Sequence, residues 1–515
     1  MAIAEYISVT KEQCYETTRT GIRDSIFEFL NRHNSRFVWL QGPPGSGKTA
    51  IAKSIANTLA KNKRLAASFF WDKTGSRANA DSIEMFPSTL ASQLARFNRD
   101  YEMLLANILS DWSARDILTL PLEMRMDSLV VRPMRSISQA FWSAEPCPVV
   151  VLDGLDECGS RHALGELMKM VVLLDKLPPE FMILVSARRE PEIRRVLERT
   201  LNIPRLHTDK ISEADTNHTI KLMVEHGLAE IPQPPQSNWS PSEDDVRAFV
   251  GTCRQLPVLA EIRVREVRIL ASYGDTFKNA FHIVKDNGAL SRDLNDDYLR
   301  ILRRAYMRGN VYHSASHSIQ TAVLAMPNNE LTVSPHVLRT YQQVVGTVIA
   351  ARKPLSVQTM SNILAISEGD IRAVLDPIGS IINAPISDDD TVHFYHATAK
   401  EFLIGPPQGD DHDRGFFFTD IEGDFLALPL LKVLNCKDNL KRDSGRSVRV
   451  GKHIAYAAEH WLTHLNLSSV SGPLWEELRL FLTTKLLFWI ALLPNPVDTL
   501  RAVLKQREVS KHTID

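Results

Sequence analysis

Eight residues near the N-terminus have the types and the spacing that bind phosphate. Residues 42–49 read GPPGSGKT and match the pattern G-x-x-x-x-G-K-T. Glycines at these positions let the backbone turn its N–H groups inward, and a helix that follows adds the positive end of its dipole. Lys48 would reach the β- and γ-phosphates, and the Thr49 hydroxyl would be a ligand of Mg²⁺. The predicted phosphate loop consists of Gly42, Pro43, Pro44, Gly45, Ser46, Gly47, Lys48 and Thr49.

A second set of chemistry-bearing residues follows another apolar run. In PVVVLDGLDEC, residues 148–158, Asp153 ends the run, and Asp156 and Glu157 come on the next turn. An aspartate at the end of a strand can hold Mg²⁺ through water. Glu157 is the first candidate for polarising the attacking water, with Asp156 as its partner or as the base itself, and the sequence leaves that order open. By themselves these acids would indicate only a solvent-exposed acidic loop after a strand. Together with the phosphate loop they indicate nucleotide hydrolysis.

An arginine ends a third apolar run, FMILVSARR, residues 181–189. Arg188 would stand at the carboxyl edge of a sheet, where ligands of open α/β folds bind. Its guanidinium could contact the γ-phosphate there. An ordinary surface arginine is the alternative.

The elements that must position these groups can be read from hydrophobic patterns. Residues 37–40 carry no charge and predict a buried strand, and alanines and isoleucines at helical spacing predict a helix over Thr49–Leu59. Runs this apolar, separated by helices, predict an α/β P-loop NTPase core with a parallel sheet and helices on both faces. The predicted strands are FVWLQ, LAASFFW, PVVVLDG, FMILVSA and IPRLHT.

After about residue 220 the sequence has no further apolar runs of this kind, and the remainder of the chain is predicted to be mainly helical. A proline-rich connector precedes a new helix, for which Ser240–Glu243 predicts a capping box. The run INAPISDDDTVHFYHAT, residues 382–398, predicts a hairpin next to helices, as in a winged-helix unit. The last part is predicted to be all-α, with Trp461, Trp475 and Trp489 filling its core.

These patterns divide the chain into five predicted segments. Residues 1–35 would form the N-terminal segment with a first helix, and residues 36–235 the nucleotide-binding domain. A small helical domain, a winged-helix domain and a C-terminal helical domain would follow, over residues 236–292, 293–405 and 406–515.

Composition excludes several classes of protein. The formal net charge of −1 over 515 residues argues against general affinity for nucleic acid or for anionic membranes. The five cysteines have no ligand spacing, so we expect reduced thiols and no zinc framework. The strongest apolar run, Leu486–Leu493, is far shorter than the ~20 residues of a membrane span, and the N-terminus does not resemble a signal peptide. We therefore expect a cytoplasmic protein without a membrane span.

The order of several motifs resembles that of the NACHT NTPase domains of fungal NLR-type proteins, members of the STAND class of signalling ATPases. The motifs are GPPGSGKT, FPSTLASQLA, VVVLDGLDEC and FMILVSARREPEIRR, with CYETTRTGIRDSIFEFL upstream and FYHATAKEFL downstream. The resemblance implies a switch that binds ATP/ADP, or GTP/GDP, with Mg²⁺ and hydrolyses the triphosphate slowly. It also implies self-association in the triphosphate state and a role in fungal non-self recognition or innate-immunity-like signalling.

The same resemblance gives two further residues a role. His396, in FYHATAKEFL, corresponds to the winged-helix histidine that contacts the β-phosphate of ADP and locks the closed form. Pro257, in CRQLPVLAEI, corresponds to the proline that packs near the base, although relatives carry a glycine-glycine-leucine-phenylalanine pattern there. Arg188 corresponds to the sensor arginine, followed here by Arg189 in place of the usual proline.

Other functions remain open from the sequence. A binding scaffold that holds nucleotide permanently, without a cycle, is the main alternative, and a P-loop kinase would need an arginine-rich lid that the sequence lacks. Relatives commonly add repeats as a sensor and an effector domain, and neither is recognisable here. A truncated sequence, a fragment, or a switch that works with separate sensor or effector proteins would each explain this.

Overall fold

The computed structural model describes most of the chain, which divides into two compact units. The described residues are 18–31, 36–74, 82–111, 117, 119–137, 147–200, 205–207, 213–233, 239–307, 333–385, 387, 390–419, 425–436, 451–465 and 471–492. One unit comprises Met1–Ser291 with His396–Thr398, and the other Arg292–Tyr395 with Ala399–Asp515. The five-segment division predicted from the sequence is finer than this and stays a prediction.

The first unit contains a parallel sheet of five strands in the order β2-β3-β4-β1-β5. The strands are β1 (Phe37–Gln41), β2 (Leu65–Phe70), β3 (Val149–Asp153), β4 (Met182–Ala187) and β5 (Arg205–His207). Each lies within one of the five predicted apolar runs, so the predicted α/β core is confirmed. Two connections join strands that are not neighbours in the sheet. The chain passes over β4 and β3 between β1 and β2, and over β1 between β4 and β5.

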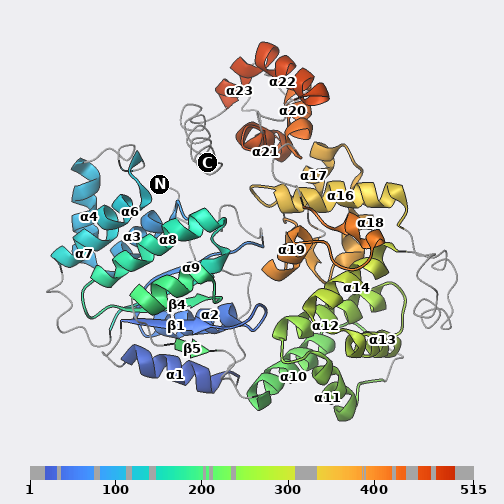
Figure 1. Cartoon of the computed structure of the whole chain (residues 1–515), viewed down its shortest axis with the longest axis horizontal. Helices are drawn as coiled ribbons and strands as arrows, with labels where there is room; N and C mark the ends of the chain where they lie inside the picture. Colours follow the sequence, from blue (N-terminus) through green and yellow to red (C-terminus); the bar gives the residue numbers. More distant parts are fainter. Residues whose placement is uncertain are drawn as a thin grey trace. The chain divides into compact units, whose positions relative to one another are not determined.

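Both faces of the sheet are covered by helices, as Figure 1 shows for α1 on one side and α8 on the other. Side chains of β1 alternate between the two cores: Val38 and Leu40 pack with α1 and α2, whereas Phe37 and Trp39 pack on the opposite side with α3 and α8. This alternation follows from the period of two along a strand. Burial on both faces explains why the strands are almost wholly apolar.

The helical segments of the first unit are α1 (Thr20–Asn31), α2 (Lys48–Lys61), α3 (Phe86–Phe97), α4 (Arg99–Asp111), α6 (Leu122–Met126), the π-helical η1 (Asp127–Val131), α7 (Arg132–Ser136), the short turns η3 (Leu155–Glu157) and η4 (Leu174–Lys176), α8 (Arg161–Leu173), α9 (Pro191–Arg194), η5 (Arg195–Thr200), α10 (Glu213–Ala229), α11 (Glu243–Thr252), α12 (Pro257–Ser272) and α13 (Phe277–Leu290).

Helix α11 begins two residues later than the sequence predicts. Its cap is Ser242, whose hydroxyl accepts from the Asp245 backbone N–H at 3.1 Å, while the Asp245 carboxylate accepts from the Ser242 backbone N–H at 3.2 Å. The prediction that Ser240–Glu243 forms the capping box was therefore wrong. An aspartate can close such a box as well as a glutamate, and here Asp245 lies three residues after the cap.

The elements after Ser291 are α14 (Leu294–Tyr306), α16 (Pro335–Ala350), α17 (Val357–Leu364), α18 (Glu368–Leu375), η7 (Asp376–Ile378), β6 (Ile382–Asn383), β7 (His393–Phe394), α19 (Ala397–Ile404), η8 (Asp411–Phe416), α20 (Ala427–Asn435), α21 (Lys452–His460), α22 (Gly472–Thr484) and α23 (Leu486–Leu492). Strands β6 and β7 form a short antiparallel pair within the run expected to form a hairpin. Among the described residues, no helix combines the length and apolar character needed to cross a bilayer.

Two of the three C-terminal tryptophans are core residues. Trp461 and Trp489 are 4% and 1% exposed and lie edge to face, with ring centroids 5.7 Å apart. Trp475, on α22, is 50% exposed, so its predicted place in the core was wrong. Its helix buries Leu474, Leu478 and Phe481 instead, and position 475 lies off that stripe.

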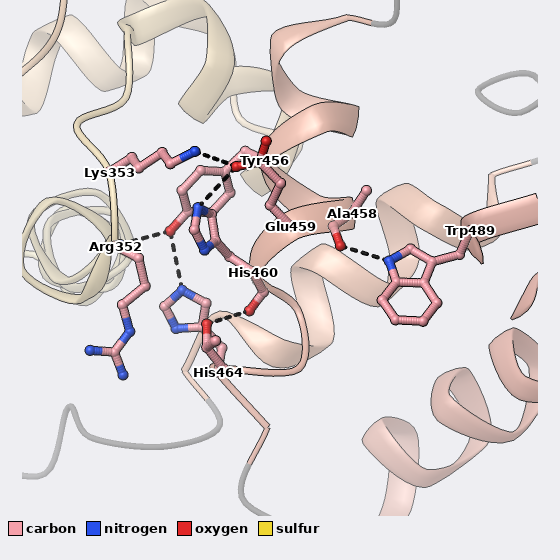
Figure 2. Close-up of polar contacts among 9 residues, drawn as sticks. Arg352, Lys353, Tyr456, Ala458, Glu459, His460, His464 and Trp489 are labelled. Carbon is pink, nitrogen blue, oxygen red and sulfur yellow. Dashed lines mark hydrogen bonds and ion pairs between the residues drawn. The ribbon is translucent and has the colours of Figure 1, made fainter. Parts of the chain in front are cut away.

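A buried polar network joins α21 to the segment that follows α16 (Figure 2). The Tyr456 hydroxyl accepts from the Arg352 backbone N–H at 3.0 Å and lies 3.1 Å from His464 Nε2. The tautomer of His464 decides whether this hydroxyl donates to Nε2 or accepts from it. Lys353 and Glu459 form an ion pair beside it. Burial, reinforced by Arg352, lowers the pKa of His464 to about 3.

Acid should destabilise this network. Burial also lowers the pKa of His460 to about 4, so both histidines are neutral in the folded chain below their ordinary pKa of 6.5. As the pH falls below 6.5 the unfolded chain takes up protons first, and the free energy of unfolding drops by up to about 1.4 kcal/mol per pH unit for each histidine. Their contribution is complete above pH 6.5 and is lost between pH 6.5 and pH 3.

The measurement is thermal unfolding of the wild type and of His464→Gln between pH 8 and pH 4. Glutamine can accept from the Tyr456 hydroxyl or donate to it but does not titrate, so the melting temperature of the variant should fall less steeply below pH 6.5. Parallel curves for the two proteins would contradict the assignment.

Candidate nucleotide site

The loop after β1 has the backbone of a phosphate cradle. Gly45 and Gly47 lie in the left-handed region, with φ of 73° and 88°, and Gly47 is the residue that caps α2. Left-handed glycines at alternate positions are typical of backbone concavities that bind anions. Ser46 between them is buried, and Pro43 and Pro44 are exposed. These residues therefore form a candidate anion site at the N-terminus of a 14-residue helix.

Lys48 lies over this loop. Its Nζ donates to the backbone carbonyls of Gly42 at 2.8 Å and Pro43 at 3.0 Å. Burial lowers the pKa of the Lys48 ammonium, and three acids, Asp153, Asp156 and Glu157, oppose that shift. A bound phosphate would act in the same direction as the acids, because an anion stabilises the charged form.

Strand register brings the sequence-distant candidates to one edge of the sheet. Gln41 pairs with Ala187, so Gly42 and Arg188 both follow the ends of neighbouring strands. Asp153 pairs with Ser186 on the other side of β4. The structure therefore brings the phosphate loop, Asp153 and Arg188 together, as parallel strands with a common carboxyl edge require.

Gly154 makes the turn that presents the two acids. Its φ is 75°, and a Cβ there would lie 2.9 Å from the Trp71 carbonyl oxygen. Its N–H donates to the Ser186 carbonyl at 2.9 Å, and its carbonyl accepts from Glu157 N at 2.7 Å. A side chain at this position would combine strain with a backbone clash. The glycine thus ends β3 and starts the short turn that carries Asp156 and Glu157.

The two acids have different surroundings. Asp156 is paired with Arg188 through both carboxylate oxygens: Oδ1 accepts from the Arg188 backbone N–H at 2.9 Å, and Oδ2 lies 3.0 Å from its Nε. The Asp156 side chain is 6% exposed. Glu157 accepts from the backbone N–H of Lys73, just after β2, at 3.2 Å. Asp156 is thus part of an ion pair that orients Arg188, whereas Glu157 is held by a neutral amide.

The residues present suit Mg²⁺. Asp153 is 1% exposed at the end of β3, Thr49 lies in the first turn of α2, and these two elements pack together. A buried carboxylate and a hydroxyl are oxygen ligands of the kind that Mg²⁺ prefers. Thr49 and Asp153 are the residues that would hold the ion.

The phosphate loop is also covered by α12, which the loop pattern could not reveal. Pro257 is the buried first residue of α12, and the next residue, Val258, lies against Gly45. A Cβ on Gly45 would come within 2.4 Å of Val258 Cγ1. The sequence CRQLPVLAEI drew attention to Pro257, whose predicted place near the base stays a prediction, and its neighbour Val258 contacts the loop. His396 lies half-buried directly before α19, and its role as a phosphate lock stays a prediction.

Four of the five cysteines lie among the residues that the structure describes. Cys147, Cys158, Cys253 and Cys436 form no disulfide, and in the part of the chain that the structure describes no group of three or more His, Cys, Asp or Glu side chains could hold a metal. Cys14 lies outside the described residues.

The fold and the site define a P-loop NTPase core. A parallel α/β sheet carries the GPPGSGKT loop after one internal strand and a buried aspartate at the end of another. The family model described as Nephrocystin 3, N-terminal, matches residues 19–188, which is less than half of the chain. No curated protein matches the sequence.

Solved structures with partial likeness include archaeal ATPases. A Walker-type ATPase of Pyrococcus abyssi is 14% identical with a TM-score of 0.35, over 76% of this chain and 98% of its own. A STAND protein with a tetratricopeptide repeat sensor from Pyrococcus horikoshii is 10% identical with a TM-score of 0.43, over 98% of this chain and 55% of its own. PCH-2 of C. elegans is 14% identical with a TM-score of 0.29, over 54% of this chain and 70% of its own. Since these scores are below 0.5, the assignment rests on strand order and site geometry.

Proposed function

We propose that the chain is a nucleotide-operated switch of STAND type that binds ATP or GTP with Mg²⁺ and hydrolyses it slowly. The observation that carries the proposal is the common carboxyl edge of the sheet, where the phosphate loop, Asp153 and Arg188 follow the ends of three neighbouring strands and Asp156 pairs with Arg188. A pocket that only stored nucleotide would not require a second and a third acid. A role in signalling oligomerisation, including fungal non-self recognition, rests on the motif order alone.

In this proposal each residue of the site has a separate role in binding or hydrolysis. The loop amides and Lys48 bind the phosphates, with Lys48 exchanging its carbonyl partners for phosphate oxygens. Glu157 orients and deprotonates the attacking water, since Asp156 is already engaged with Arg188. When bound, Mg²⁺ would neutralise charge on the β- and γ-phosphates. Arg188, oriented by Asp156, contacts the γ-phosphate and so distinguishes triphosphate from diphosphate.

A switch also requires that nucleotide state alter another part of the protein. The contact between Gly45 and Val258 supplies one route, because the loop and the first turn of α12 pack directly against each other. Pro257 would pack near the base, and His396 would contact the β-phosphate of bound diphosphate. Nucleotide shifts the equilibrium only through contacts that differ between the two states, and Arg188 and His396 are the proposed sources.

The testing experiment is to identify the nucleotide that copurifies with the whole chain and to measure ADP and ATP affinity beside Lys48→Ala. We expect bound diphosphate, which would also identify the base, and affinity at least about a hundredfold weaker in the variant. Lys61→Ala, an exposed lysine at the opposite end of α2, is the matched control and should bind normally.

If the wild type does not bind ATP with Mg²⁺, the proposal is wrong. Tight binding with no hydrolysis and no effect of the triphosphate on particle size would instead favour the nucleotide-stabilised scaffold.

A further inference from the structure

The turn between α11 and α12 contains two consecutive residues in the left-handed region of backbone conformation. Arg254 and Gln255 have φ of 50° and 60°, and both are exposed. In this region a residue with a side chain is disfavoured by a factor of about 5 to 30 in an equilibrium constant. Two such residues in succession persist where the surrounding structure imposes them, and strain of this kind is typical of switch regions.

The residues on either side of Arg254 and Gln255 fix the ends of the turn. Cys253 is buried directly after α11, and its carbonyl accepts from Leu256 N at 2.9 Å. Pro257, the first residue of α12, restricts Leu256 to extended backbone, with φ of −107°. The chain must therefore change direction within the two residues between these ends, which explains why both are left-handed.

The strained turn leads directly to the contact between α12 and the phosphate loop. Val258, the second residue of α12, is 2% exposed, and a Cβ on Gly45 would come within 2.4 Å of its Cγ1. A rotation of φ at Gln255 turns the backbone that follows, and with it the first turn of α12. Since the strain is present while Val258 lies on the loop, moving this first turn away relieves it.

We propose that Arg254 and Gln255 form a strained hinge that sets the rate at which nucleotide leaves the phosphate loop. The strain lowers the cost of moving the first turn of α12 away from Gly45, and this movement uncovers the loop. Bound nucleoside diphosphate therefore leaves faster than it would beside an unstrained turn. This inference rests on the proposed function and adds a regulatory element that the loop motif does not contain.

The test is the rate at which fluorescent N-methylanthraniloyl ADP, or the GDP analogue where the copurifying base is guanine, dissociates from the whole chain in excess unlabelled diphosphate with Mg²⁺. Gln255→Gly removes strain, because glycine takes positive φ readily, and release should slow by about twofold to tenfold after the entropy cost of glycine. Gln255→Val adds strain, because a β-branched residue with positive φ is an outlier, and release should become at least about fivefold faster. Since Gln255 is exposed, neither change alters a buried side chain.

Lys63 supplies the matched control. It is exposed in the same unit, has φ of 57°, and lies between α2 and β2, past the end of α2 that is opposite the phosphate loop. Lys63→Gly and Lys63→Val make the same changes of backbone strain at that position. The melting temperature should rise and fall in this series as in the Gln255 series, but diphosphate release should stay at the wild-type rate.

Three results would overturn the inference while the proposed function stands. They are release at the wild-type rate from both Gln255 variants despite different melting temperatures, faster release from Gln255→Gly, and an equal shift of release in the Lys63 series. If Gln255→Val does not fold, Gln255→Gly decides alone. If the wild type binds neither diphosphate analogue, the proposed nucleotide site itself fails, and the hinge with it.

Discussion

Glu157→Gln should reduce nucleotide hydrolysis by about a hundredfold to ten-thousandfold, the range that a positioned general base contributes. Glutamine has the same shape and can still accept from the Lys73 backbone N–H, so the turn after β3 should persist. It cannot take a proton from water. Nucleotide affinity should therefore stay within a few-fold of the wild type while the chemical step fails.

Single-turnover hydrolysis and equilibrium binding, measured on the same preparations, separate these effects. Glu166→Gln makes the same change on α8, away from the strand ends, and should hydrolyse normally. Light scattering should show that Glu157→Gln with ATP and Mg²⁺ shifts toward larger assemblies, since a switch would be trapped in its triphosphate state. Hydrolysis at the wild-type rate would remove Glu157 from the proposed base position and leave Asp156, which Asp156→Asn then tests.

Arg303→Met should lower the free energy of unfolding of the second unit by about 1–3 kcal/mol, because it leaves the fully buried Asp413 carboxylate without a partner, although Arg303 itself is 40% exposed. Asp413 has a fully buried side chain, and Arg303 binds it with two hydrogen bonds, Nε to Oδ1 at 2.9 Å and Nη2 to Oδ2 at 2.6 Å. Asp410 adds a third contact to Arg303 at 3.0 Å. Without the guanidinium, the Asp413 carboxylate would be buried without its cation.

Arg414→Met is the matched control, because its partner Asp411 lies in the same segment but both side chains are largely exposed, at 73% and 83%. Its effect should be below about 0.5 kcal/mol. Hydrogen exchange on the whole chain would locate the change, with faster exchange expected in α14 and over residues 411–416. In the double variant Arg303→Met/Asp413→Leu most of the stability should return, because no charge is left buried. Equal stability of Arg303→Met and the wild type would contradict the argument.

The sequence by itself determined the local parts of the site. The glycines, lysine and threonine of the phosphate loop are consecutive, so their conformation depends on their own φ preferences and on the helix that follows. The five strands were predictable for a similar reason, since strands buried on both faces need uninterrupted apolar runs. The strand prediction was confirmed, and the assignment of the loop residues to phosphate binding stays a prediction. Helix starts were less certain, because Ser240 and Ser242 can both serve as caps and only the packed helix selects Ser242.

The tertiary structure decided which residues meet. Asp156 contacts Arg188 across 32 positions, and Glu157 contacts Lys73 across 84. Such contacts depend on the strand order β2-β3-β4-β1-β5, and no local propensity encodes that order. For the same reason the sequence could not separate Asp156 from Glu157, place Val258 on Gly45, or leave Trp475 outside the core. Whether two residues touch is a property of the packed sheet and helices, because burial and register are decided only when all the elements are in place.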